Sequence, residues 1–205
     1  MMDIQRINTY NDNRFSHTAL QQHGCFFVDG APYEVEIISD YEAVVCGENQ
    51  AVYTELINEF RFYAPHITRF YGKSGQMIKE YPRVQRLTLH LDQIQPSQFL
   101  VDADKITAIS AFIQKPQDII IQVLPHENRF ISLDGHTRLY YAVMKGWECI
   151  RAVVETSDNW VYKFVAEAQN RGVYTPKDMA LVSHAEYEEQ WLRLCDDLFA
   201  GNGAE

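Results

Sequence analysis

Long apolar runs are missing from this sequence. Its 205 residues include no stretch of about 18 uncharged apolar residues, the length that a membrane-spanning helix needs. The first residues, "MMDIQRINTYNDNRFSH", also lack the apolar centre of a signal peptide. Since 46% of the residues are hydrophobic, the chain can still bury a substantial core. We therefore expect a cytoplasmic globular protein with no membrane partner.

Cysteines are few and widely spaced. Cys25, Cys46, Cys149 and Cys195 form neither a C-x-x-C redox pair nor a local zinc-binding motif. We expect four reduced thiols, and the sequence predicts no metal site.

Positive charge is scarce except in one segment. The chain has 18 Lys and Arg against 28 Asp and Glu, a net charge of −10, which disfavours duplex DNA as a partner. Residues 61–86, the basic segment, nevertheless combine six cations with several aromatic rings. Such a mixture suits phosphates and stacked bases, and it also suits a solvated hairpin whose cations balance acidic neighbours. Both readings stay open.

The order of the predicted elements indicates an α+β fold. Asp29-Gly30 between two β-rich runs predicts a hairpin, and residues 50–62 have the apolar spacing of an amphipathic helix. Residues 83–156 read as strand, helix, strand, strand, helix, strand. Further helices are predicted beyond, one starting at Pro176 and one at the capping box Ser183-x-x-Glu186. We expect three parts: 1–80, an α+β extension with a hairpin and a helix; 83–156, the central domain; and 157–205, a helical appendage.

The stretch "LDGHTRLYYAVMKG" places polar residues where a strand ends and a helix begins. The first N–H groups of a helix lack intrahelical partners and attract anions. Gly135 lets an anion approach the main chain, His136 and Thr137 add donors, and Arg138 offers a planar fork to phosphate oxygens. Asp134 either caps the helix, holds a metal, or accepts a proton from a substrate hydroxyl. We interpret the stretch as a phosphate-binding turn.

The same residues resemble the ParB/sulfiredoxin superfamily, whose small α+β domain binds nucleotides. The resemblance covers about residues 83–156, and its motif Asp-Gly-His-x-Arg is followed at family spacing by Ala142 and Gly146. It implies a mixed-sheet domain that binds ATP or ADP, or CTP, with Mg²⁺. It further implies that residues 135–138 hold the nucleotide phosphates and that Asp134 handles an acceptor hydroxyl, as in the free-serine-kinase branch.

Two departures from that branch affect the chemistry. Gln98 stands where those kinases have a glutamate, and Thr137 replaces a second histidine. Because an amide cannot act as a general base, Asp92, Asp102 or His90 would have to take over, or the chain binds nucleotide without that reaction. His136 occupies the position of the sulfiredoxin cysteine, so sulfiredoxin activity is not expected.

The sequence therefore predicts a nucleotide-binding protein that can be a phosphotransferase acting on a small molecule. The alternative is a non-enzymatic regulator or nucleic-acid-associated module that uses the basic segment as its contact surface.

Overall fold

The computed structural model describes residues 2–200. Residues 1 and 201–205, the ends of the predicted N-terminal extension and C-terminal helices, lie outside the described residues. The chain divides into two compact units, Met1–Gln85 and Arg86–Glu205. No helix within residues 2–200 is long and apolar enough to cross a membrane. Both units combine helices with sheets, so the fold is α+β, as the sequence predicts.

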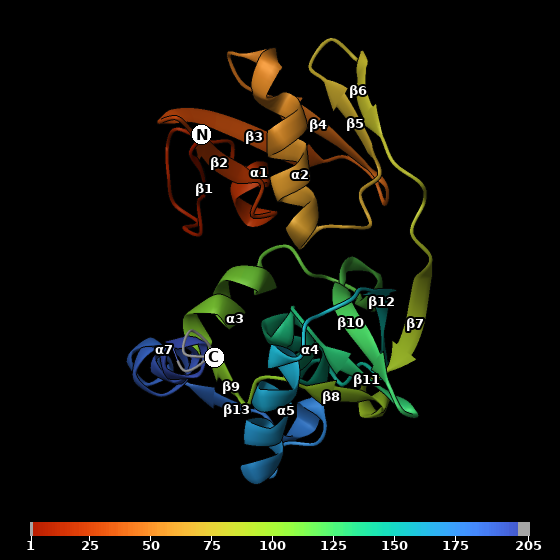
Figure 1. Cartoon of the computed structure of the whole chain (residues 1–205), viewed down its shortest axis with the longest axis vertical. Helices are drawn as coiled ribbons and strands as arrows, with labels where there is room; N and C mark the ends of the chain where they lie inside the picture. The colour runs from red at the N-terminus through yellow and green to blue at the C-terminus, as the bar shows by residue number, and fades with distance from the viewer. Residues whose placement is uncertain (1, 201–205) are drawn as a thin grey trace. The chain divides into compact units, whose positions relative to one another are not determined.

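The first unit is a six-stranded sheet in the order β1-β2-β3-β4-β5-β6, antiparallel except for the parallel pair β4 and β5. Figure 1 shows helix α2 lying along this sheet, where Leu56, Ile57 and Phe60 enter its core. Its elements are β1 (Ile4–Arg6), α1 (His17–Gln21), β2 (Cys25–Val28), β3 (Ala31–Ile37), β4 (Glu42–Cys46), η1 (Gln50–Val52), α2 (Tyr53–Tyr63), β5 (Arg69–Gly72) and β6 (Met77–Glu80).

The predicted hairpin and helix of this unit are confirmed. Asp29 and Gly30 have φ of 49° and 81°, the left-handed values that a two-residue turn with two positive φ angles needs. The amphipathic helix predicted over 50–62 is formed by η1 and α2. The short β1 and α1 were not predicted.

The second unit contains a five-stranded mixed sheet in the order β7-β12-β10-β11-β8 and a parallel pair, β9 and β13. Strands β12 and β10 are parallel, as are β11 and β8. Its elements are β7 (Arg86–His90), η2 (Leu91–Gln93), β8 (Ile94–Pro96), β9 (Leu100–Asp102), α3 (Ala103–Ser110), η3 (Pro116–Asp118), β10 (Ile120–His126), β11 (Arg129–Ser132), α4 (His136–Met144), β12 (Cys149–Val154), α5 (Trp160–Asn170), η4 (Pro176–Asp178), β13 (Ala180–Val182), α6 (His184–Tyr187), η5 (Glu188–Leu192) and α7 (Arg193–Ala200).

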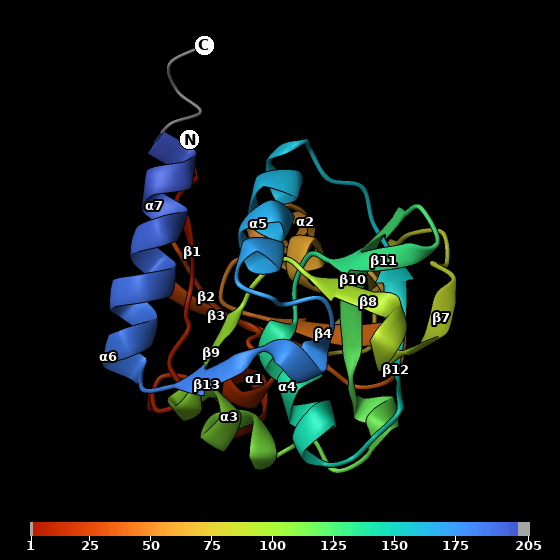
Figure 2. The same ribbon diagram turned by 90° about the horizontal axis from the view of Figure 1, so that it is seen from below.

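The C-terminal segment is built into this second unit. Strand β13 pairs with β9, and Figure 2 shows helices α6 and α7 continuing from it. Tyr187 and Trp191 enter the same core as Ile106, Ile109 and Leu139. The helix predicted from Pro176 onward is wrong beyond its first turn, because residues 180–182 form β13 instead. Main-chain pairing with β9 overrides the local helix signal there.

Candidate functional site

The predicted phosphate-binding turn lies between β11 and α4. Gly135 precedes the helix with φ of 88°, and no side chain caps the helix start. A Cβ atom at this position would lie 2.5 Å from Ile121 Cγ2 and 3.1 Å from Arg138 Nε and Nη2. Both the backbone angle and the available space therefore require glycine. The first N–H groups of α4 are left for an acceptor from outside the helix.

Arg138 is held beside this helix start by two acceptors. Its Nη1 donates to Ile120 O at 2.6 Å, and its Nη2 donates to Asp134 Oδ2 at 2.7 Å. The side chains of Arg138 and Asp134 remain 30% and 55% exposed. The guanidinium is thus oriented before any ligand arrives, and Asp134 partly balances its charge. Thr137, one residue before Arg138, is half-buried.

The side chain of His136 points into the protein. Its Nε2 lies 2.9 Å from Ser132 Oγ and 3.1 Å from Ser97 Oγ, and Ser97 also donates to Ser132 O at 2.7 Å. Burial lowers the pKa of His136 to about 4, against the opposing charge of Asp134. The imidazole is therefore neutral at pH 7 and joins the ends of β8 and β11. Its backbone N–H still belongs to the first turn of α4.

Gln98 is buried beside residues that the sequence did not single out. Its Nε2 donates to Leu100 O and to the Tyr187 hydroxyl, the latter at 3.4 Å. Burial raises the pKa of Tyr187, and the charges of Cys195, Asp102 and Asp134 contribute to the rise. The Lys105 ammonium lies 4.4 Å from the centre of the Tyr187 ring. Tyr187 of α6 thus lies beside Gln98, and Lys105 of α3 lies against the Tyr187 ring.

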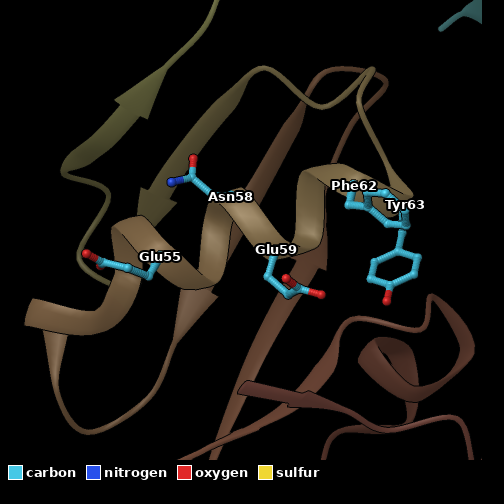
Figure 3. A pocket seen from close by; sticks show the side chains of 5 residues that line it. All are labelled: Glu55, Asn58, Glu59, Phe62 and Tyr63. Carbon is cyan, nitrogen blue, oxygen red and sulfur yellow. The ribbon is translucent and has the colours of Figure 1, made fainter. Parts of the chain in front are cut away.

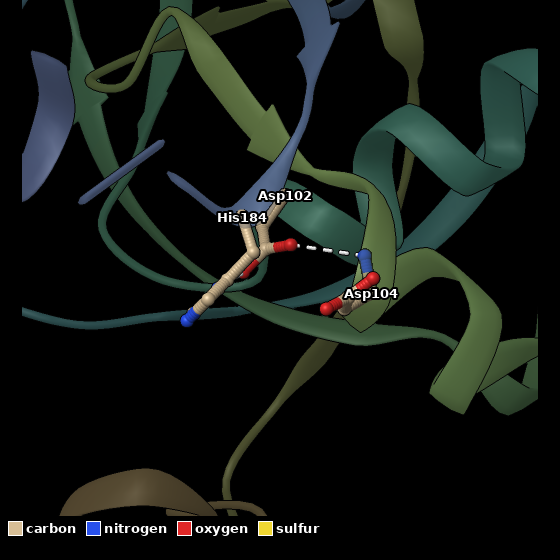
Figure 4. Close-up of side chains that lie close together, drawn as sticks. All are labelled: Asp102, Asp104 and His184. Atoms are coloured by element: carbon tan, nitrogen blue, oxygen red, sulfur yellow. Dashed lines mark hydrogen bonds and ion pairs between the residues drawn. The ribbon is translucent and has the colours of Figure 1, made fainter. Parts of the chain in front are cut away.

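Asp102 uses both carboxylate oxygens within the protein. It is 1% exposed, and its Oδ1 accepts from Asp104 N at 2.9 Å, which caps α3. Its Oδ2 lies 2.7 Å from His184 Nδ1, and this bond raises the pKa of His184. Figure 4 shows Asp102, Asp104 and His184 together, with ligand atoms within 4.8 Å of one another. The group ties the start of α6 to β9 and α3, so Asp102 is not positioned to deprotonate a substrate.

The same group is a poor match for magnesium. Mg²⁺ prefers a near-octahedral set of oxygen ligands and keeps several waters, whereas this group offers an imidazole nitrogen and two carboxylates, of which that of Asp102 is already bonded through both oxygens.

His90 lies away from the predicted turn. It ends β7, where it pairs with Cys149, and its backbone N–H donates to Gln93 Oε1 at 3.0 Å. Strands β12 and β10 lie between β7 and β11 in the sheet. The structure therefore does not bring His90 together with Ser132 and the start of α4.

Several cations of the basic segment interact within the first unit. The Arg61 guanidinium lies 3.7 Å from the centre of the Tyr81 ring, and that of Arg83 lies 4.8 Å from the Tyr41 ring. Arg69 forms a 3.2 Å ion pair with Glu42. These contacts favour the reading of a hairpin whose cations balance aromatic and acidic neighbours.

A shallow depression of about 520 Å³ lies on α2. It is lined by Glu55, Asn58, Glu59, Phe62 and Tyr63, as Figure 3 shows. The Arg6 guanidinium lies 3.7 Å from the Tyr63 ring centre, and Asn58 accepts a hydrogen bond from the Tyr81 hydroxyl. All five lining residues come from one helix, whereas a ligand site usually gathers polar groups from several elements.

Comparison with known proteins identifies no family. No protein-family model matches the chain, and no curated protein matches its sequence. Among solved structures, the crystal structure of protein Atu1540 from Agrobacterium tumefaciens is similar over 48% of this chain and 63% of that chain, with 13% sequence identity and a TM-score of 0.35. The chain thus spans less than two thirds of that protein. Similarity at this level establishes neither a shared family nor a shared function.

Proposed function

We propose that the unit Arg86–Glu205 binds a nucleotide by its phosphates at the start of α4, in the manner of ParB/sulfiredoxin proteins. The observation that carries the proposal is the arrangement at Gly135. A glycine with φ of 88° opens an uncapped helix start, and Arg138 is fixed directly over it. An anion placed there would receive main-chain N–H donors and a guanidinium together.

The roles proposed for the other residues of the turn follow from their surroundings. His136 contributes its backbone N–H, while its neutral ring keeps β8 and β11 in place beside the site. Thr137 can add a hydroxyl donor from the first turn. Lys105, at the Tyr187 ring, supplies a second cation for a polyphosphate.

We further propose that the reaction, where one occurs, is transfer of a phosphoryl group to a small hydroxyl compound. A magnesium nucleotide, ATP or ADP or CTP, would supply the phosphoryl group and carry the metal on its own phosphates. The chain would contribute positioning and charge neutralisation through Arg138. Asp134 is the carboxylate best placed to orient the acceptor hydroxyl, because both oxygens of Asp102 are bonded and Gln98 is an amide.

The experiment that tests nucleotide binding is a thermal-shift screen of ATP, ADP, CTP and GTP with magnesium. A ligand that binds only the folded chain raises the melting temperature, because it stabilises that state by RT ln(1 + [L]/Kd), where [L] is the free ligand concentration. We expect at least one nucleotide to raise it for the wild type and not for Arg138→Ala. If all four leave the wild type unchanged, the proposal fails.

A further inference from the structure

We propose that a second site, formed by the β10–β11 hairpin with β8 and α5, binds a small organic carboxylate through Arg129. The cavity has a volume of about 290 Å³. It is lined by Gln95, His126, Glu127, Arg129, Ile131, Val165 and Gln169. Polar groups from the hairpin, a strand and a helix converge on one hollow with an apolar wall, the usual composition of a small-ligand site. The proposal does not depend on nucleotide binding.

The guanidinium of Arg129 is fixed from one side. Its Nη2 donates to the carbonyl oxygens of Asp92, Ile94 and Tyr174 at 3.2, 3.1 and 2.5 Å. The positive charge of Arg129 helps to lower the pKa of Asp178, but the Asp178 carboxylate accepts its hydrogen bonds from Tyr174 and Thr175 and not from Arg129. Arg129 is therefore positioned without the side-chain entropy cost that a flexible cation pays on binding.

The other donors of Arg129 are left without partners. Its Nε is buried and has no hydrogen-bond partner, and within residues 2–200 its Nη1 has none either. A guanidinium presents five N–H donors, and a carboxylate matches them with two acceptor oxygens. An anion in the cavity would accept a hydrogen bond from Nη1, whereas the buried Nε stays unpaired.

The remaining walls indicate the shape of the ligand. Gln95 is 4% exposed and is fixed by donating to Pro96 O and Val173 O, while its Oε1 accepts from Gln169 Nε2 at 3.2 Å. Ile131 and Val165, which are 0% and 7% exposed, belong to one buried apolar cluster, so the apolar wall that they give the cavity suits only a small alkyl group. The ligand class is thus a small aliphatic carboxylate.

Glu127 distinguishes two kinds of small aliphatic carboxylate, an α-amino acid and a plain carboxylic acid. It lies on the hairpin turn with φ of 51° and is one of the residues that line the cavity. An α-amino acid would place its ammonium group against Glu127, whereas a plain carboxylic acid would be repelled by it. Glu127→Gln should therefore weaken binding of the first ligand and strengthen binding of the second.

The test titrates the full ¹⁵N-labelled chain with isobutyrate, with valine, and with isobutyramide as the uncharged analogue, following amide shifts in β11 and α5. We expect saturable shifts with isobutyrate or valine, no saturable shifts with isobutyramide, and at least tenfold weaker binding in Arg129→Lys. The control Arg171→Lys, on the exposed end of α5, should bind as the wild type does. Equal shifts with isobutyrate and isobutyramide, or no shifts with either isobutyrate or valine, would overturn the proposal. This comparison needs only the wild type, so it still decides the question if Arg129→Lys folds poorly. Glu127→Gln then tells the amino acid from the plain acid.

Discussion

Arg138 and Asp134, four positions apart in sequence, are paired across the first turn of α4, with Nη2 and Oδ2 2.7 Å apart. The pair joins the cation that we propose binds the nucleotide phosphates to the carboxylate that we propose orients the acceptor hydroxyl. Because both side chains are partly exposed, the pair itself contributes only about 0–1 kcal/mol to stability. Its orientation, rather than its strength, matters to the proposed site.

Replacing Asp134 should abolish phosphoryl transfer but leave nucleotide binding nearly unchanged. In Asp134→Asn the amide can still accept from Arg138, so we expect nucleotide affinity to stay within about threefold of the wild type. Turnover of nucleotide with a small hydroxyl acceptor should be lost, because an amide cannot take the proton. Calorimetric titration and release of the nucleotide product measure the two effects. An unchanged rate would remove Asp134 from the reaction.

Stability should fall when acid protonates His136. With a folded pKa of about 4 and an unfolded value of about 6.5, its contribution is complete above pH 6.5 and is lost as the pH falls toward 4, by about 3 kcal/mol in total. Urea unfolding at several pH values between 5 and 7 measures this slope. His136→Gln, which removes the titration, should flatten it; equal slopes in the two proteins would contradict the neutral, buried imidazole.

The Asp102–His184 pair should show the opposite pH dependence. The bond raises the pKa of His184, so its stabilising effect is complete below the unfolded value of about 6.5 and is lost as the pH rises through the folded value. Asp102→Asn keeps a capping side chain for α3 but loses the charge, and should therefore be more destabilised relative to the wild type at pH 6 than at pH 9. Asp102→Ala also loses the cap, at a further cost of about 0.5–2 kcal/mol. If the deficit of the Asn variant does not change with pH, the pair is not ionic.

Two glycines with similar backbone angles should tolerate alanine very differently. Gly135 and Gly146 have φ of 88° and 68°, but a Cβ atom at 146 meets nothing within 4 Å, whereas one at 135 meets Ile121 and Arg138. We expect Gly146→Ala to cost about 1 kcal/mol for the left-handed backbone alone. Gly135→Ala should cost about 1–3 kcal/mol more for the added steric conflict. Urea unfolding compares them, and equal losses would mean that the turn can relax away from Ile121.

Much of the second unit could be predicted because its signals are local. Asp102 caps α3, Ile106, Ile109 and Ile113 recur at helical spacing and are buried, and the predicted capping box Ser183-x-x-Glu186 begins α6. Each of these depends on residues within one or two turns of each other.

The pairing of β9 with β13 could not be predicted in the same way. It joins residues 100–102 to residues 180–182, and each strand is only three residues long. Such short strands leave little alternation to detect, and "PKDMALV" begins with a proline, which favours a helix start.

Because of the same long-range pairing, part of the candidate site could not be predicted from the sequence. Because β13 leads into α6, it places Tyr187 beside Gln98 and Lys105, residues far from it in sequence. The inward direction of His136 likewise depends on Ser97 and Ser132 on two different strands, which a linear motif does not reveal.

The central claim is that the start of α4 with Arg138 binds nucleotide phosphates, and calorimetric titration of magnesium nucleotides tests it most directly. The comparison uses the wild type, Arg138→Ala, and Lys145→Ala, which removes an exposed cation just beyond the other end of the same helix. The account predicts that Arg138→Ala weakens binding at least tenfold, about 1.4 kcal/mol or more, while Lys145→Ala binds as the wild type does. Equal affinity of all three proteins, or no binding to the wild type, would contradict it.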